Sequence, residues 1–151
     1  AAPEGKGTVL DLYCGAGTIG LSMADKVKKL IGVEIIPEAI ENAKENATRN
    51  NIRNAEFFCG DAGKVASELI EKGVCPDVIV LDPARKGCDN VAIEAILKMN
   101  PERIVYISCN PATCARDLKI LCENGYRAEK ARAVDMFPRT NHCECVVKLV
   151  K

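Results

Sequence analysis

Short apolar segments alternate with amphipathic segments from Thr8 to Asn124, and this alternation limits the possible folds more than any other feature of the sequence. The apolar segments are rich in Val, Ile and Leu, which is typical of buried strands. The segments between them repeat apolar residues at helical spacing. Strands that alternate with helices form a parallel sheet with helices on both faces. The sequence therefore predicts a doubly wound α/β domain.

The boundaries of these segments follow from apolar periodicity and from Gly, Pro and Asn at the turns. The predicted strands are 8–12, 29–34, 55–59, 77–81, 104–107, 126–134 and 143–150. The predicted helices are 19–28, 37–50, 65–71, 91–99 and 111–124, and in the last of these Ala115, Leu118, Leu121 and Cys122 would face the core. The last two strands have no helix between them, so the final strand should run antiparallel to its neighbours. We expect one domain with a mostly parallel sheet of seven strands.

The composition excludes several classes of protein. A hydrophobic content of 48% and a charged content of 28% are typical of a soluble globular domain. Basic and acidic residues number 21 each, so bulk charge indicates neither nucleic-acid nor membrane binding. There is no apolar run of membrane-spanning length and no signal peptide at the start. The nine cysteines form no CxxC pair, so we expect reduced thiols in a cytoplasmic protein and no metal site.

Cys109 lies where a predicted buried strand gives way to a helix. Asn110 can cap that helix, and Pro111 suits its first turn. In an open α/β sheet the carboxyl ends of the strands form the ligand-binding edge, and a helix N-terminus favours a thiolate. Cys109 is therefore either a nucleophile or a structural cysteine at the end of a strand. These residues alone support both interpretations.

A glycine-rich turn follows the first predicted strand. Gly15 and Gly17 would let the backbone turn tightly and approach a ligand closely. With Gly20 the segment reads GAGTIG, so a nicotinamide dinucleotide remains an alternative ligand. An ordinary strand-to-helix turn is the simpler alternative.

Three carboxylates follow other predicted strands. Glu34 ends the second strand, Asp61 follows the third and Asp82 follows the fourth, so all should meet at one edge of the sheet. Carboxylates can serve the ribose hydroxyls, the adenine amino group and the cationic amino-acid end of S-adenosylmethionine. This donor set favours S-adenosylmethionine over a ligand that contains phosphate. Asp61 can also cap the helix that follows it.

Several motifs, taken together, identify a family. The segments DLYCGAGTIGL, VIVLDPARKG, IVYISCNPATCARDL and DMFPRTNHCE occur in this order and closely resemble the RNA 5-methyluridine methyltransferases. The resemblance extends over nearly the whole chain and is closer to the branch that modifies 23S rRNA than to the tRNA branch. It implies a Rossmann-like, class I S-adenosylmethionine-dependent methyltransferase fold. Relatives carry an RNA-binding region upstream, so residues 1–151 are expected to be the catalytic domain of a longer protein.

The resemblance also implies roles for individual residues. Cys109 corresponds to the nucleophile and Glu144 to the general base. The positions that correspond to cofactor contacts are Tyr13, Thr18, Glu34, Asp61 and Asp82, and the glycine turn adds Gly15 and Gly17. Asp82 and Arg85 correspond to residues of the uracil pocket, while Arg139 is a candidate phosphate contact and His142 is more consistent with a structural role. Cys143 and Cys145 depart from the family pattern beside Glu144.

The chemistry explains why a cysteine and a carboxylate are needed. Carbon 5 of uracil is a poor nucleophile, and addition of a thiolate to carbon 6 converts the ring into an enolate that can accept a methyl group at carbon 5. The proton on carbon 5 must then leave, which requires a base such as Glu144. A 5-methylcytosine RNA methyltransferase is an alternative, although Ala84 and Ser108 stand where it would carry different residues. A cofactor-binding fragment that is inactive on its own is another.

Overall fold

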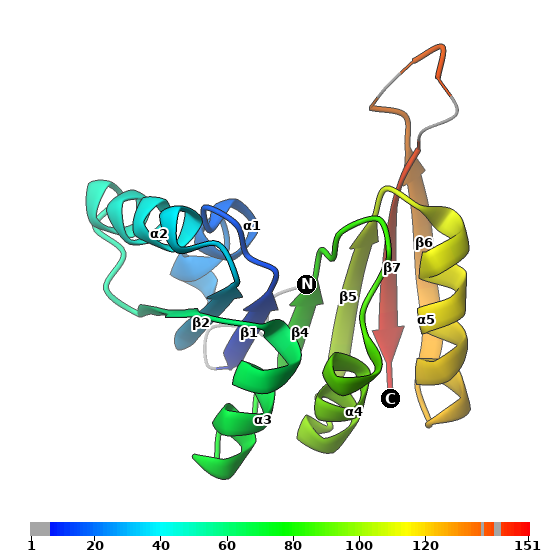
Figure 1. The fold of residues 1–151 in the computed structure, drawn as a ribbon, viewed down its shortest axis with the longest axis horizontal. Coiled ribbons are helices and arrows are strands. Elements are labelled where there is room, and N and C mark those ends of the chain that lie inside the picture. The colour runs from blue at the N-terminus through cyan, green and yellow to red at the C-terminus, as the bar shows by residue number, and fades with distance from the viewer. Residues whose placement is uncertain (1–6, 137, 141–142) are drawn as a thin grey trace.

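The protein is described by a computed structural model that covers residues 7–136, 138–140 and 143–151. Within these residues the chain forms one sheet of seven strands with helices packed against it (Figure 1). The strands are β1 (Thr8–Leu12), β2 (Lys29–Glu34), β3 (Ala55–Cys59), β4 (Val78–Leu81), β5 (Arg103–Ser108), β6 (Arg127–Val134) and β7 (Glu144–Val150). The helices are α1 (Thr18–Leu21), α2 (Pro37–Arg49), α3 (Ala62–Glu71), α4 (Asn90–Met99) and α5 (Pro111–Glu123), with a 3-10 turn η1 (Ala24–Lys26).

The strand order is β3-β2-β1-β4-β5-β7-β6, and the strands from β3 to β5 pair in parallel. Strand β7 is antiparallel to both of its neighbours, β5 and β6. This topology confirms the predicted mostly parallel sheet of seven strands. The chain moves outward from β1 to β3 and then returns to place β4 on the other side of β1. Ligands bind at such a reversal in open α/β sheets.

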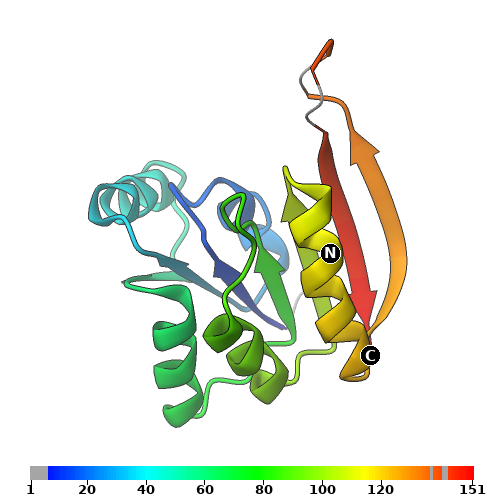
Figure 2. The ribbon, with the colours of Figure 1, turned by 45° about the vertical axis from the view of Figure 1, so that its right-hand side comes forward.

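The central strands β1, β2 and β4 are buried on both faces of the sheet, because four consecutive residues of each strand are buried. Leu10, Leu12, Ile79 and Leu81 face helices α3, α4 and α5, where they join the larger apolar cluster. Neighbouring positions such as Val9 pack on the opposite face against the segment around α1. Figure 2 shows α3, α4 and α5 on one side of the sheet. No helix within the described ranges is long and apolar enough to cross a bilayer.

The predicted helix at residues 19–28 is wrong. The structure has only the short helix α1, followed by the 3-10 turn η1. Gly20 and Ser22 are weak helix formers, and the Ser22 hydroxyl donates to the carbonyl of Ile19 at 2.7 Å. Gly20 must also approach β1 closely, since a Cβ at this position would lie 2.8 Å from Asp11 Oδ2. The helix therefore ends after one turn.

The inward face of α5 also differs from the prediction. Among the four residues predicted to face the core, Leu121 is buried and Leu118 is partly buried, whereas Ala115 and Cys122 are exposed. The buried positions of this helix are Cys114, Asp117 and Leu121. The prediction failed because a charged residue occupies the inner stripe, and apolar periodicity assigns charged residues to the surface.

Candidate functional site

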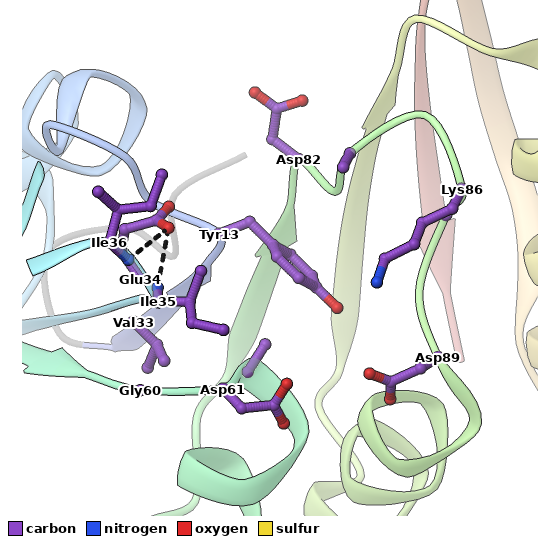
Figure 3. A pocket seen from close by; sticks show the side chains of 13 residues that line it. Tyr13, Val33, Glu34, Ile35, Ile36, Gly60, Asp61, Asp82, Lys86 and Asp89 are labelled. Atoms are coloured by element: carbon purple, nitrogen blue, oxygen red, sulfur yellow. Dashed lines mark hydrogen bonds between the residues drawn. The ribbon is translucent and has the colours of Figure 1, made fainter.

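A cavity of about 400 Å³ opens at the carboxyl ends of β1 to β4 (Figure 3). It is lined by Tyr13, Val33, Glu34, Ile35, Ile36, Gly60, Asp61, Ala62, Asp82, Ala84, Lys86, Gly87 and Asp89. The loops that follow four different strands contribute these residues, so the sheet brings together side chains that are far apart in the sequence. This arrangement puts the predicted carboxylates Glu34, Asp61 and Asp82 around one space.

Glu34 is held in place by backbone N–H groups. Its Oε2 accepts from the Gly15 N–H at 3.0 Å. Its Oε1 accepts from the N–H of Ile35 at 2.8 Å and from that of Ile36 at 3.1 Å (Figure 3). Gly15 reaches Glu34 because it adopts a positive φ of 54°. The glycine turn thus orients a carboxylate at the cavity, and Gly15 acts through its backbone rather than by lining the space.

Tyr13 contributes the largest side chain in the cavity, and Figure 3 shows its ring between Glu34 and Lys86. Burial, together with the neighbouring Cys88 thiol, raises the pKa of its hydroxyl. Gly17 and Thr18 do not line this cavity. Gly17 precedes α1 with a φ of 80°, and Thr18 lines a separate hollow beside α2.

Asp61 has both of the roles considered from the sequence, because it caps a helix and also lines the cavity. Its Oδ1 accepts from the Lys64 backbone N–H at 3.1 Å, which caps α3, and its side chain also lines the cavity. Asp89 does the same for α4, because its Oδ1 accepts from the Ala92 N–H at 2.8 Å. The sequence reasoning missed Asp89. An acidic residue just before a helical run was the available signal.

Asp11 is a buried carboxylate that the sequence analysis did not single out. It is 1% exposed, and its Oδ2 accepts from the Gly20 N–H at 3.0 Å, while Oδ1 has no partner among the described residues. Burial raises the pKa of this carboxyl to about 7, and the charges of Asp82 and Glu34 add to the effect against the opposing hydrogen bond from Gly20. The sequence signal for this buried carboxylate was an acidic residue, Asp11, in the middle of an apolar strand.

The Asp11→Asn variant is expected to gain stability, relative to the parent, as the pH rises. The carboxyl has an ordinary pKa of 3.8 and a folded-state pKa of about 7, so the folded state retains a proton that the unfolded state loses. The parent should therefore lose stability between these values, by up to about 4 kcal/mol. Urea unfolding at about pH 4 and about pH 8 measures this change. If the difference in unfolding free energy between the parent and Asp11→Asn does not change with pH, the raised pKa of Asp11 is contradicted.

Cys109 and Glu144 come together through the pairing of β5 with β7. This antiparallel ladder ends at the pair of Ser108 with Cys145. Cys109 follows Ser108 at the end of β5 and Glu144 precedes Cys145 at the start of β7, so the pairing brings the two residues to adjoining strand ends. Cys109 is partly buried. The register thus puts the predicted nucleophile beside the predicted base.

Asp82 connects this pair with the cavity. Partial burial raises the pKa of its carboxyl, and the charge of Glu144 raises it further. The two carboxylates are therefore within electrostatic reach of each other. Since Asp82 lines the cavity, Glu144 is within electrostatic reach of the cavity wall, although neither Glu144 nor Cys109 lines the cavity.

The loop of residues 82–89 is joined to the Cys109 segment by hydrogen bonds. The carbonyl of Arg85 accepts from Asn110 Nδ2 at 3.1 Å and from Thr113 Oγ1 at 3.0 Å. Asn110 also caps α5 as predicted, since its Oδ1 accepts from the Ala112 N–H at 3.1 Å. The predicted uracil-pocket residue Arg85 is thus anchored beside Cys109 by its main chain, with an exposed side chain.

Arg139 does not approach the cavity. It is exposed in the connection between β6 and β7, which Figures 1 and 2 show projecting beyond the sheet. His142 lies outside the described residues. All nine cysteines are free thiols, and the described part of the chain contains no group of three or more His, Cys, Asp or Glu side chains arranged to hold a metal ion.

The chemistry of the cavity fits a nucleoside with a cationic tail. Four carboxylates and one lysine line it. Ile35 and Ile36 supply an exposed apolar wall suited to a base. A dinucleotide would instead bring its pyrophosphate to a helix N-terminus, and the helix after the glycine turn has only four residues. The nicotinamide alternative is therefore disfavoured.

Comparison with known proteins gives a consistent result. Residues 1–151 match the family model described as tRNA (uracil-5-)-methyltransferase. An uncharacterized RNA methyltransferase of Bacillus cereus is 55% identical over 144 residues, which are 95% of this chain and 31% of that protein. One of Clostridium tetani is 52% identical over 144 residues, with 95% and 31% covered. The chain thus spans about a third of the length of these relatives.

Two of the similar solved structures illustrate the likeness. The Pyrococcus abyssi tRNA (uracil-54, C5)-methyltransferase in complex with S-adenosyl-L-homocysteine has a TM-score of 0.84 and 37% identity, over 97% of this chain and 35% of that one. A precorrin-6y C5,15-methyltransferase of Geobacter metallireducens has a TM-score of 0.79 at 14% identity, over 99% and 82%. The second likeness concerns the fold alone, which is the predicted class I methyltransferase fold.

Proposed function

Because its whole length matches the family model, the chain belongs to the tRNA (uracil-5-)-methyltransferase family, and we propose that it transfers a methyl group from S-adenosylmethionine to carbon 5 of a uridine in RNA. The observation that carries this proposal is the juxtaposition of Cys109 and Glu144 beside a cavity lined by carboxylates. Thiol and carboxylate are the two groups that methylation of uracil through a covalent adduct requires.

The cavity would bind the methyl donor through its carboxylates. Glu34 would accept from the ribose hydroxyls, Asp61 from the adenine amino group, and Asp82 from the ammonium group of the amino-acid end. Tyr13 would pack against the bound nucleoside. When bound, S-adenosylmethionine supplies an electrophilic methyl group and leaves as S-adenosylhomocysteine.

The uracil would be activated from the other side of the site. The thiolate of Cys109 adds to carbon 6, and the electron pair of the 5,6 double bond moves into the ring as an enolate. Carbon 5 of this enolate takes the methyl group. Glu144 then removes the remaining proton from carbon 5, the double bond re-forms, and the thiolate of Cys109 leaves. Asp82 and Arg85 offer an acceptor and a donor for the edge of the uracil ring.

The experiment that tests this function is methylation of RNA by the intact gene product that contains this chain. Unmodified RNA and S-adenosylmethionine are combined, and the RNA is digested to nucleosides for mass spectrometry. The expected product is 5-methyluridine. Recovery of 5-methylcytidine would favour the alternative cytosine enzyme, and RNA without any new methyl group would contradict the proposal.

The methylation experiment is carried out separately with 23S rRNA and with tRNA. The sequence motifs favour 23S rRNA as the substrate, and we propose it as the first candidate. The likeness to a tRNA enzyme of Pyrococcus abyssi at 37% identity makes tRNA the second. Transcripts of both are compared at equal concentration, and the preferred substrate is the one with the higher kcat/KM.

Glu34→Ala is expected to weaken binding of S-adenosylhomocysteine by about tenfold or more, because a hydrogen bond to a charged group contributes roughly 1.5–3 kcal/mol. Isothermal titration calorimetry measures the dissociation constant. Glu38→Ala is the matched control, since Glu38 is an exposed glutamate four residues away on α2. Equal affinities for the two variants would exclude Glu34 from the donor site.

A further inference from the structure

Asp117 is a buried carboxylate with no place in the chemistry described above. It lies on the inner stripe of α5 and is 1% exposed. Its Oδ2 accepts from the Tyr106 hydroxyl at 2.5 Å and from the Cys88 backbone N–H at 2.8 Å. Its Oδ1 accepts from Arg116 Nε at 2.8 Å. Well-packed apolar residues often stabilise a fold as well as a buried ion pair does, so stability alone does not account for this carboxylate.

Arg116 extends the contact from Asp117 to the loop of residues 82–89. One guanidinium nitrogen donates to the carbonyl of Lys86 at 2.9 Å and to that of Cys88 at 3.2 Å. These contacts hold the Arg116 side chain against the loop. Asp117 therefore binds the backbone N–H of Cys88, while Arg116 binds the backbone carbonyls of Lys86 and Cys88.

Gly87 shows how closely the loop approaches this pair. It has a φ of 77°, and a Cβ at this position would lie 2.5 Å from Asp117 Oδ2 and 2.6 Å from a guanidinium nitrogen of Arg116. Both values are far below van der Waals contact, so a side chain here would push the loop away from α5. The backbone of the loop is thus in direct contact with the Asp117–Arg116 ion pair.

The same stretch of loop forms a wall of the donor cavity. Lys86 and Gly87 line it, and Figure 3 shows the Lys86 side chain extending over the space beside Tyr13. The buried Cys88 thiol has a raised pKa because of burial, and the neighbouring hydroxyls of Tyr106 and Tyr13 act against this rise. Asp117, which accepts from the Tyr106 hydroxyl and from the Cys88 backbone N–H, is therefore close to the groups that surround Tyr13 in the cavity.

We propose that Asp117 is a positioning residue for the methyl-donor site, which holds the wall formed by residues 86–88, and through it Tyr13, against the helix that follows Cys109. The inference rests on the proposed function, because it assigns the cavity to the donor. It adds a residue that touches neither donor nor uracil. The position of the donor relative to Cys109 then depends on the contacts of Asp117 with this loop.

The test is Asp117→Asn in the intact gene product. Asparagine matches the shape but removes the charge and sets an N–H₂ group against either Arg116 or the Cys88 and Tyr106 donors. The dissociation constant for S-adenosylhomocysteine and the KM for S-adenosylmethionine are expected to rise at least tenfold. An irreversibly misfolded fraction would lower the apparent kcat and leave both quantities unchanged. Reversible unfolding raises the apparent dissociation constant in proportion to the loss of folded protein, so a thermal unfolding curve of the variant accompanies the measurement.

Asp77→Asn is the matched control. Asp77 is a partly buried carboxylate that accepts the Thr8 N–H at 2.7 Å, at the opposite edge of the sheet. This variant is expected to lower the unfolding temperature without changing donor affinity. If the two variants have the same affinity for the donor product, the proposal for Asp117 is overturned.

Arg116→Met is a second variant, which keeps the proposal testable if Asp117→Asn does not fold. The Arg116 side chain is about half exposed, and methionine preserves most of its apolar stem while it removes the donors to Lys86 and Cys88. A rise in the dissociation constant supports the proposal, and an unchanged value overturns it. If the parent protein neither binds S-adenosylhomocysteine nor methylates RNA, the proposed function itself fails, which is a different outcome.

Discussion

Replacing Cys109 by serine is expected to abolish the covalent complex between the intact gene product and RNA that contains 5-fluorouridine. In the parent protein the thiolate adds to carbon 6 and the methyl group is transferred, but fluorine at carbon 5 cannot leave as a proton does. The adduct is then trapped and withstands denaturation. A serine hydroxyl is a far weaker nucleophile at neutral pH, so methyl transfer should fall by a factor of roughly 10³ or more. A denaturing gel and mass spectrometry measure both effects.

Two other cysteines provide controls for this experiment. Cys143 is partly buried and adjacent to Glu144, which makes it the nearest competitor for the role of nucleophile. Cys122 is an exposed thiol on the same helix that follows Cys109. Cys143→Ser and Cys122→Ser are both expected to form the adduct at the parental rate. An adduct that persists in Cys109→Ser, or that disappears in Cys143→Ser, would remove Cys109 from its proposed role.

Donor affinity separates loss of the nucleophile from loss of the fold. Cys109 does not line the cavity, so Cys109→Ser should bind S-adenosylhomocysteine as tightly as the parent does. A combination of normal binding and absent adduct is the specific signature of a missing nucleophile. Weakened binding would instead indicate that serine disturbs the end of β5.

Much of the fold follows from local signals in the sequence. The predicted strands 8–12, 29–34 and 55–59 have the boundaries that the structure shows, because each is an apolar run that ends at a turn. The predicted helix at 19–28 failed partly because of a contact outside that segment. Gly20 is drawn against Asp11 on β1, and this tertiary contact outweighs the apolar spacing of the following residues.

Buried charges account for most of what the sequence did not predict about the site. Periodicity places Asp11 and Asp117 on the surface, yet both are 1% exposed. The groups that make burial of Asp117 possible lie on β5 and on the loop before α4, at Tyr106 and Cys88. Such partners become neighbours only through the tertiary fold, and no local pattern identifies them in advance.

The relation between Cys109 and Glu144 shows the limit of strand-level reasoning. The sequence predicted that the last strand runs antiparallel, and the resemblance assigned both residues. The register required the actual pairing of β5 with β7, in which a slip of one residue would turn Glu144 to the opposite face. The structure therefore adds the strand pairing that brings the ends carrying Cys109 and Glu144 together, as the proposed chemistry requires.

Replacing Glu144 by glutamine is expected to trap the adduct with ordinary uridine. Addition of Cys109 to carbon 6 and methyl transfer do not require the base, whereas elimination needs removal of the proton from carbon 5. The variant should therefore release about one equivalent of S-adenosylhomocysteine and then stop, with RNA still attached. A burst measurement and a denaturing gel detect the two effects. Normal turnover would refute the assignment of the base.

Glu129→Gln is the matched control for this variant. Glu129 is an exposed glutamate on β6 that forms an ion pair with Lys148 of β7, so its loss removes a carboxylate from the same pair of strands. We expect turnover at the parental rate. A stalled adduct in Glu129→Gln would indicate that the β6–β7 pair as a whole, rather than the Glu144 carboxylate, is needed for release.

Asp82 is the other carboxylate that could act as the base, and the charge of Glu144 distinguishes the two. That charge contributes to the raised pKa of Asp82, so Glu144→Gln should lower this pKa and leave Asp82 more fully ionised. If Asp82 were the base, Glu144→Gln would extend product release to lower pH, and Asp82→Asn would trap the adduct. With Glu144 as the base, Glu144→Gln stalls at every pH. Asp82→Asn then raises the KM for the donor without accumulating adduct.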